Sequence, residues 1–187
     1  MVEMVEIFFL TKYIVFLYIV FDRGEEMKKL KLYFDSSAIS ALVQDSKPER
    51  MSDMRTLWEM IKRGEYDVVL SNVLTGELND IEDIEKREIL FYYLSEIIAE
   101  RVYTTDEMQE IAEMLVKCGI LTENSFSDCQ HIACALVKRC DIIVSYNFRH
   151  MVNVRVIKGV RRISFIEGYG DIDIMTAETL IEKGGES

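Results

Sequence analysis

The sequence predicts an α/β protein in which a central, mostly parallel sheet lies between two layers of helices. Three short apolar segments have the β-branched or aromatic composition of strands buried on both faces: 31–35 (KLYFD), 66–71 (YDVVLS) and 141–146 (DIIVSY). A fourth short strand is expected near Ile172–Ile174. Segments with apolar residues at helical spacing separate these strands. Such alternation is typical of parallel strands that helical crossovers connect and cover on both faces.

The predicted helices lie between these strands and in the tail. Ser36 and Ser37 suit the start of a helix over 36–43, and Gly64 suits the left-handed end of a helix over 49–63. The other predicted helices cover 73–81, 85–100, 106–118, 125–139 with Ser127 as its cap, a stretch after Asn153, and a final segment after Thr176.

Length and composition indicate one globular domain. The chain has 187 residues, of which 49% are hydrophobic and 29% charged, so a disordered protein is excluded. The net charge of −11 disfavours a protein that coats nucleic acid irrespective of sequence, because affinity for phosphates usually comes from Lys and Arg. The charge remains compatible with a nuclease whose acidic site binds metal ions, because the ion is then the largest local charge.

The cysteines indicate a reducing compartment. No pair of them has CxxC spacing, and no histidine lies at a zinc-like interval from a pair. We therefore expect structural thiols in the cytoplasm, with zinc or disulfides as the alternative, at Cys118, Cys129, Cys134 and Cys140.

The apolar run over 7–21 is too short and too interrupted for a membrane span, since Lys12 breaks it. Acidic residues in the leader also disfavour a secretory signal. We expect residues 1–26 to be an apolar N-terminal extension and residues 27–187 to form the domain. One hypothesis is that translation begins at Met27, which would make the extension an artefact of a misplaced start or a loosely attached segment.

Four oxygen-bearing side chains fall where a parallel sheet binds its ligands, beyond the carboxyl ends of the strands. Asp35 ends the first strand, and Glu77 lies six residues past the second, in the following helix. Asp128 opens the helix before the third long strand, and Asn147 follows that strand. Carboxylate and carbonyl oxygens are the ligands that Mg²⁺ and Mn²⁺ prefer.

Each of these residues also has an ordinary structural interpretation. Asp35 suits the N-cap of the next helix, and Asp128 suits the positive end of a helix dipole. Glu77 belongs to an acidic run of the kind that usually forms a solvated face, and Asn147 suits a turn. Their shared position at one edge of the predicted sheet favours the metal site.

Four segments resemble, in order, the motifs of PIN (PilT N-terminus) domains, a family that includes the toxins of VapC-type toxin–antitoxin pairs. The segments are YFDSSAIS (33–40), LSNVLTGEL (70–78), FSDCQHIACAL (126–136) and DIIVSYNFRHMVN (141–153). The tail GYGDIDIMTAETLI (168–181) also resembles one PIN subgroup. The resemblance covers about residues 28–182.

The resemblance implies a PIN-like three-layer α/β/α fold and a ribonuclease that hydrolyses RNA phosphodiesters with a metal-activated water, using Mg²⁺ or Mn²⁺. Asp35, Glu77 and Asp128 match the metal-binding acids of the family. Asn147 matches a fourth position that is often Asp, where its carbonyl oxygen could coordinate the metal. Two hydroxyl residues would support these ligands, at Ser37 and Ser145. His131 stays outside the predicted catalytic set.

The resemblance also implies partners: an RNA substrate, an antitoxin protein and a second copy of the chain in a homodimer. Membrane association is not expected. Phosphate contacts are expected from the main basic positions near the site and in the tail, namely Lys138, Arg139, Arg149, Arg161 and Arg162.

Two other functions compete with the ribonuclease. A phosphatase that uses Asp35 as its nucleophile would usually have a second Asp two positions later, where this chain has Ser37. A catalytically weak PIN domain that binds RNA or protein is the stronger alternative, since Asn147 and the acidic surface favour it.

Overall fold

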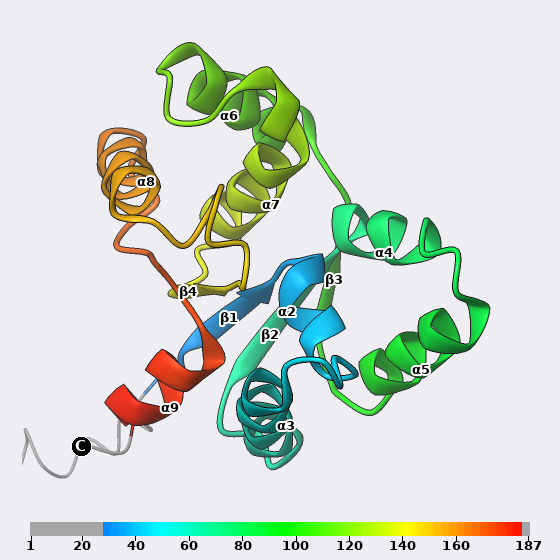
Figure 1. Ribbon diagram of the computed structural model, residues 1–187. Coiled ribbons are helices and arrows are strands. Elements are labelled where there is room, and N and C mark those ends of the chain that lie inside the picture. Colours follow the sequence, from blue (N-terminus) through cyan, green and yellow to red (C-terminus); the bar gives the residue numbers. More distant parts are fainter. Residues whose placement is uncertain (1–27, 185–187) are drawn as a thin grey trace, which may run out of the picture.

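The computed structural model describes residues 28–184, and a five-stranded parallel sheet forms their centre (Figure 1). Its order is β3-β2-β1-β4-β5, and each neighbouring pair is parallel. The strands are β1 (Lys31–Phe34), β2 (Asp67–Ser71), β3 (Glu100–Val102), β4 (Ile142–Val144) and β5 (Asp173–Met175).

Alternating side chains of the central strand enter two separate cores. Leu32 and Phe34 of β1 pack into one core, whereas Tyr33 packs into the other, and all three are fully buried. This explains why the strand sequence is apolar on both faces. In β4, Ile143 likewise faces the core opposite to the one that its neighbours enter.

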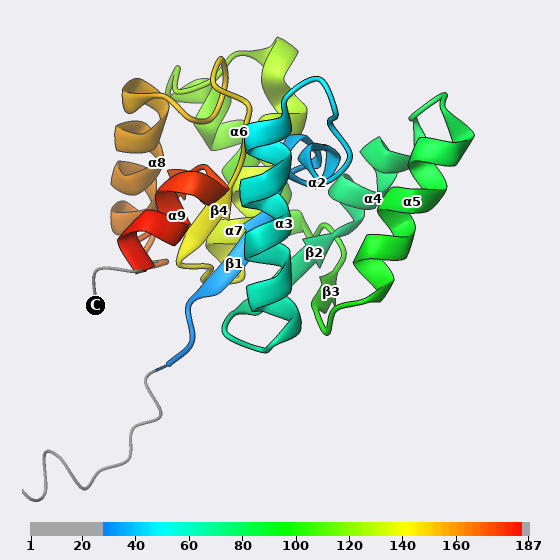
Figure 2. The ribbon, with the colours of Figure 1, turned by 60° about the horizontal axis from the view of Figure 1, so that its bottom comes forward.

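Helices cover both faces of the sheet, as Figures 1 and 2 show. One layer holds α2 (Ser36–Ala41), α3 (Pro48–Lys62), α4 (Asn72–Asn79), α5 (Ile84–Ser95) and α9 (Ala177–Gly184). The other layer holds α6 (Asp106–Lys117), α7 (Phe126–Val137) and α8 (Val154–Ile166). The predicted three-layer α/β/α architecture is thereby confirmed, and the sheet, predicted to be mostly parallel, is parallel throughout the described strands.

The strand order places the reversal of winding at the central strand β1. From β1 the chain continues to β2 on one side, and later returns from β3 to β4 on the other side of β1. The carboxyl ends of β1 and β4 therefore flank the point at which the winding direction reverses, which is where open parallel sheets bind ligands. Residues that follow these two strands are positioned there by the topology alone.

Several boundaries match the sequence, and two predictions were wrong. Gly64 has a positive φ of 78° just after α3, as its position indicated. The predicted helix over 85–100 ends instead at Ser95, and β3 follows at the sheet edge. Ser127 does not cap α7, which begins at Phe126 directly after the 3₁₀ turn Glu123–Ser125.

Two other predictions concern cysteines and the N-terminal run. All four cysteines lie within the described residues and are free, so no disulfide joins them; Cys118 is exposed and the others are buried. Within residues 28–184, no helix has the length and hydrophobicity needed to cross a bilayer. The extension predicted over 1–26 lies outside the described residues.

The close packing of α7 can be tested by enlarging one of its buried side chains. Ala133, Cys134 and Ala135 are completely buried where α7 meets the sheet and α6. We expect Ala133→Leu to lower the free energy of unfolding by about 1–3 kcal/mol, because added methylenes must displace packed neighbours. Urea denaturation would measure this loss. The matched control is Glu110→Leu on the exposed face of α6, which should change stability by less than about 0.5 kcal/mol.

Candidate active site

Asp35 has the helix-capping role that its position indicated. It is the N-cap of α2, where Oδ1 accepts hydrogen bonds from the Ala38 amide at 2.9 Å and from Ser37 Oγ at 2.7 Å. Its other oxygen, Oδ2, accepts a bond from Ser145 Oγ at 2.6 Å. The residue is only 3% exposed. The cap therefore holds the carboxylate in place at the carboxyl end of β1.

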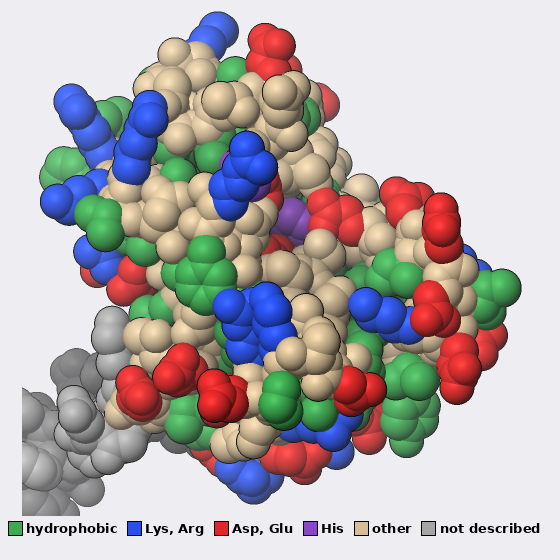
Figure 3. Space-filling view, in the orientation of Figure 1, with side chains coloured by type: hydrophobic (Ala, Val, Ile, Leu, Met, Phe, Trp, Pro, Cys, Tyr) green, Lys and Arg blue, Asp and Glu red, His purple; other side chains and the backbone are tan. Residues whose placement is uncertain are grey.

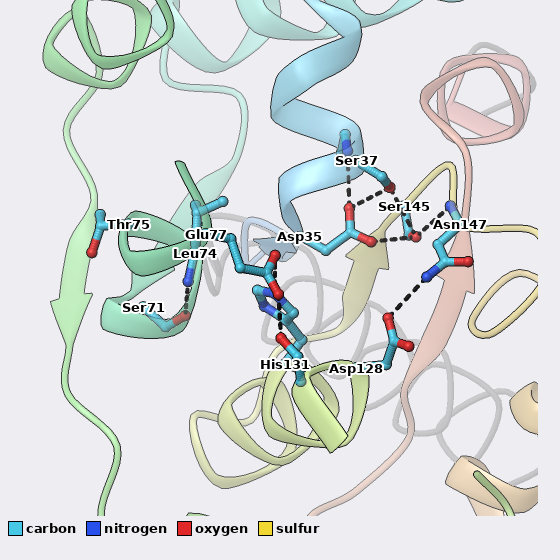
Figure 4. Close-up of polar contacts among 12 residues, drawn as sticks. Asp35, Ser37, Ser71, Leu74, Thr75, Glu77, Asp128, His131, Ser145 and Asn147 are labelled. Carbon is cyan, nitrogen blue, oxygen red and sulfur yellow. Dashed lines mark hydrogen bonds and ion pairs between the residues drawn. The ribbon is translucent and has the colours of Figure 1, made fainter. Parts of the chain in front are cut away.

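A run of hydrogen bonds connects Asp35 to Asp128, although the two are far apart in the sequence (Figure 4). Ser145 Oγ accepts a bond from the Asn147 amide at 3.0 Å while donating to Asp35. The Asn147 side chain then donates Nδ2 to Asp128 Oδ1 at 2.9 Å. The structure thus brings the ends of β1, β4 and the first turn of α7 together. Ser37 and Ser145 both contact Asp35, as the sequence indicated for supporting hydroxyls.

Burial disfavours the ionisation of both Asp35 and Asp128. Burial raises the pKa of Asp35, and the charge of His131 and the hydroxyl hydrogen bonds only partly oppose this shift. Burial also raises the pKa of Asp128, and the negative charge of Asp35 raises it further. Two partly desolvated carboxylates that repel one another form a site whose free energy falls when a cation binds.

Glu77 has a different electrostatic environment. Ser71 caps α4, which carries Glu77 toward the same edge of the sheet. The carboxylate accepts hydrogen bonds from Ser127 at Oε1 and from His131 Nε2 at Oε2, the latter at 3.1 Å. Burial would raise the pKa of Glu77, but these bonds and the charge of His131 lower it to about 2. Glu77 is consequently ionised at neutral pH.

His131 connects Glu77 to a buried hydroxyl pair. Its Nδ1 lies 2.7 Å from the Tyr33 hydroxyl, which lies 2.6 Å from Ser71 Oγ. Because the carboxylate only accepts, Nε2 of His131 carries the proton shared with Glu77. The Tyr33 hydroxyl can accept from Nδ1 of a charged ring or donate to Nδ1 of a neutral one. Since Ser71 also accepts from the Leu74 amide at the start of α4, the contacts close a ring through β1, β2, α4 and α7.

His131, which the sequence left outside the predicted catalytic set, contacts Glu77 and the Tyr33 hydroxyl. Its spacing of three residues from Asp128 places both on one face of α7, which was the available signal. The same spacing also fits an ordinary packed helix residue. Only the contacts with Tyr33 and Glu77 show that the ring orients an acid.

The acids share one edge, but they do not form a close trio. Among residues 28–184, no three His, Cys, Asp or Glu side chains lie close enough to hold one ion as they stand. Asn147 directs its amide nitrogen toward Asp128, while its Oδ1 accepts from the His150 amide at 3.1 Å. Presenting that oxygen in place of the nitrogen would require the amide to turn over and lose both bonds. Direct coordination by Asn147 stays a prediction.

The donor set nevertheless fits a hard divalent ion. The carboxylates of Asp35, Asp128 and Glu77 offer oxygen atoms that keep unused lone pairs beside their present hydrogen bonds. Mg²⁺ and Mn²⁺ characteristically use few protein carboxylates and retain several waters, so a loose set suffices. Their coordination of an ion also stays a prediction.

The basic residues expected to bind phosphate do not gather at the acids. Lys138 precedes β4 and pairs with Glu100, the first residue of β3, at 2.8 Å. Arg161 pairs with Asp173, the first residue of β5, at 2.7 Å. These residues therefore lie at the amino edge of the sheet, so the expectation for them was wrong. Arg149 follows β4 and is exposed at the carboxyl edge.

No protein-family model matches the sequence, and no curated protein matches it either. Among solved structures, the chain is similar to the crystal structure of VapC20 from Mycobacterium tuberculosis, a toxin that cleaves the sarcin–ricin loop. The identity is 20%, the alignment covers 64% of this chain and 92% of that chain, and the TM-score is 0.49. Because both the sequence identity and the TM-score are low, this similarity identifies no activity for this chain.

Removing one hydroxyl tests the buried ring. We expect Tyr33→Phe to lower the free energy of unfolding by about 1–3 kcal/mol, because His131 Nδ1 and Ser71 Oγ lose a buried partner. The control is Tyr103→Phe, whose side chain is 78% exposed. Chemical denaturation would compare the two. Equal effects of both substitutions would contradict the role given to the Tyr33 hydroxyl.

Neutralising Asp35 and neutralising Glu77 should change the stability of the metal-free protein in opposite directions. The lowered pKa of Glu77 means that its ionised form stabilises the fold fully above its ordinary value of 4.5, and less as the pH falls toward 2. The raised pKa of Asp35 means that its ionisation destabilises the fold at neutral pH, a cost that disappears on acidification through the folded pKa.

In EDTA at pH 7, we therefore expect Asp35→Asn to raise the Tm and Glu77→Gln to lower it. Thermal unfolding followed by circular dichroism would measure both. The difference between Glu77→Gln and the unchanged protein should narrow below about pH 4.5. A lower Tm for Asp35→Asn at pH 7 would contradict the electrostatic account of that residue.

Proposed function

We propose that the chain is a divalent-metal-dependent endoribonuclease of the PIN type. The observation that carries the proposal is the run of contacts from Asp35 through Ser145 and Asn147 to Asp128. It gathers two carboxylates whose pKa values burial raises at the winding reversal of a parallel sheet, which is a position for ligand binding. The four PIN-like sequence motifs supply the reaction class.

In this proposal Asp35, Asp128 and Glu77 hold Mg²⁺ or Mn²⁺. The ion, when bound, supplies Lewis-acid activation of a water and neutralises charge on the phosphate. Ser37 and Ser145 keep the Asp35 carboxylate oriented through 2.7 and 2.6 Å hydrogen bonds. The pair His131 and Ser127 orients Glu77 in the same way. Ordered supporting groups of this kind hold ligand atoms in their productive geometry.

Asn147 distinguishes this site from one with four acids. Its Nδ2 donor satisfies Asp128 without adding negative charge. The site therefore demands less positive charge than a four-carboxylate site would, which favours one ion over two. Asn147→Asp would place a third carboxylate beside Asp35 and Asp128 and raise that demand.

The toxin role and its partners belong to the same proposal. The motifs resemble those of VapC-type toxins, so the expected substrate is RNA and the expected inhibitor is an antitoxin that covers the acidic edge. A homodimer and a cytoplasmic location are proposed on the same basis. These assignments depend on the sequence motifs.

A binding module without strong catalysis is the second candidate. It is favoured by the separation of the acids, since no three metal-binding side chains within residues 28–184 converge as they stand. In that case the chain would bind RNA or a protein, with Asp35 serving as the cap of α2.

Cleavage assays distinguish the two candidates. We expect the purified chain to cleave structured RNA in Mn²⁺ and to lose this activity in EDTA. Asp35→Asn should reduce the rate by more than about 100-fold, since changes in groups that merely support a metal ligand already cost about 10–100-fold. The matched control is Asp67→Asn, an exposed aspartate at the opposite edge of the sheet, which should retain the rate. If the chain cleaves no RNA in Mn²⁺, the ribonuclease proposal is rejected and the binding module is the remaining candidate.

A further inference from the structure

Two aromatic side chains and an arginine contact one another at the loop that carries Asn147. Tyr146 and Phe148 flank Asn147 in the loop after β4, and Phe148 is 46% exposed. The guanidinium of Arg50, near the start of α3, lies 4.9 Å from the Phe148 ring centre and 5.4 Å from that of Tyr146. We call Arg50, Tyr146 and Phe148 the aromatic platform. Tyr146 is itself buried in the core that contains Phe34 and Trp58, so Phe148 is the aromatic side chain that the platform exposes.

Hydrogen bonds within the loop after β4 hold the backbone that carries the platform. The backbone carbonyl of Asn147 accepts bonds from the Met151 and Val152 amides, both at 2.9 Å, and its side-chain oxygen caps the same turn. The Phe148 amide donates to the Tyr146 carbonyl at 3.1 Å. Because this loop is already ordered, stacking on the Phe148 ring would require little loss of conformational freedom.

The platform has the composition of a nucleobase-stacking surface. Every base has a π-face that stacks on an aromatic ring, and an adjacent guanidinium adds a cation–π contribution. Arg50 also lines a surface hollow of about 350 Å³ together with Lys47 and Glu49, so positive charge lies where an attached phosphate backbone could run. Figure 3 shows Lys or Arg and hydrophobic side chains beside the hollow in which histidine and acidic side chains meet.

We propose that the aromatic platform is a stacking subsite for the base of an unpaired RNA nucleotide. The proposal rests on the proposed ribonuclease function and adds its substrate class. Asn147, which lies between the two aromatic residues in the sequence, bonds to Asp128, so the same loop carries the platform and a contact of the acids. Bases within a duplex are stacked on their neighbours and cannot present a face to Phe148. The site therefore selects single-stranded or looped RNA.

Binding can be measured without cleavage by using the Asp35→Asn protein. The probe is a fluorescein-labelled RNA strand of about 12 nucleotides, within the range that single-strand sites usually cover. The same strand in a perfect duplex is the control ligand. We expect tighter anisotropy-detected binding of the single strand. Adding Phe148→Ala or Phe148→Leu should weaken that binding by about 5- to 100-fold, whereas Phe148→Trp should retain it.

A second measurement detects stacking itself. A strand with 2-aminopurine in place of adenine should lose fluorescence on binding through contact with the Phe148 ring, and Phe148→Leu should abolish this quenching. Thermal unfolding of each variant would show that the fold is retained. The proposal would be overturned if Phe148→Leu left the affinity for the single strand unchanged. It would also be overturned if the substitution weakened the binding of single strand and duplex equally.

These binding experiments test the stacking subsite separately from the ribonuclease proposal. If the single strand binds through Phe148 but the unsubstituted chain cleaves no RNA in Mn²⁺, the stacking subsite stands and the enzyme assignment fails. If the chain cleaves RNA and Phe148→Ala changes neither binding nor the preference for unpaired substrates, the enzyme assignment stands and the subsite is rejected.

Discussion

The buried charge of Asp35 is the constraint around which the site is built. A carboxylate that is 3% exposed at the end of the central strand would be strongly destabilising without partners. The chain supplies the amide of Ala38 and the hydroxyls of Ser37 and Ser145, which come from two neighbouring elements. These contacts only partly offset desolvation, since the pKa of Asp35 remains raised. The fold therefore keeps an acid in place that a cation would stabilise.

The remaining acids divide between two electrostatic environments. Asp128 shares the charge repulsion of Asp35 and receives a hydrogen bond from Asn147. Glu77 instead is stabilised as an anion by His131, which the buried Tyr33 hydroxyl orients from the opposite side. Carboxyl groups whose pKa values are shifted in opposite directions within one cluster are a feature of functional sites.

The distribution of charge determines how this chain would bind RNA. With a net charge of −11, the protein as a whole repels phosphates, and the pairs of Lys138 and Arg161 stabilise the amino edge of the sheet. RNA that binds near the acids must then be held by side chains close to them. Stacking on Phe148 suits that requirement, because base–aromatic contact does not depend on overall charge.

The sequence by itself determined the alternation of strands and helices, and with it the placement of Asp35, Glu77 and Asp128 at one edge, because parallel strands share their carboxyl edge. It could not reveal β3, since a three-residue edge strand with only Val102 buried has no periodic signal. Tertiary structure alone decided that Ser127 and His131 contact Glu77, 50 and 54 residues away, and that Arg50 reaches Phe148. Such contacts depend on how helices pack across the sheet, which local spacing does not encode.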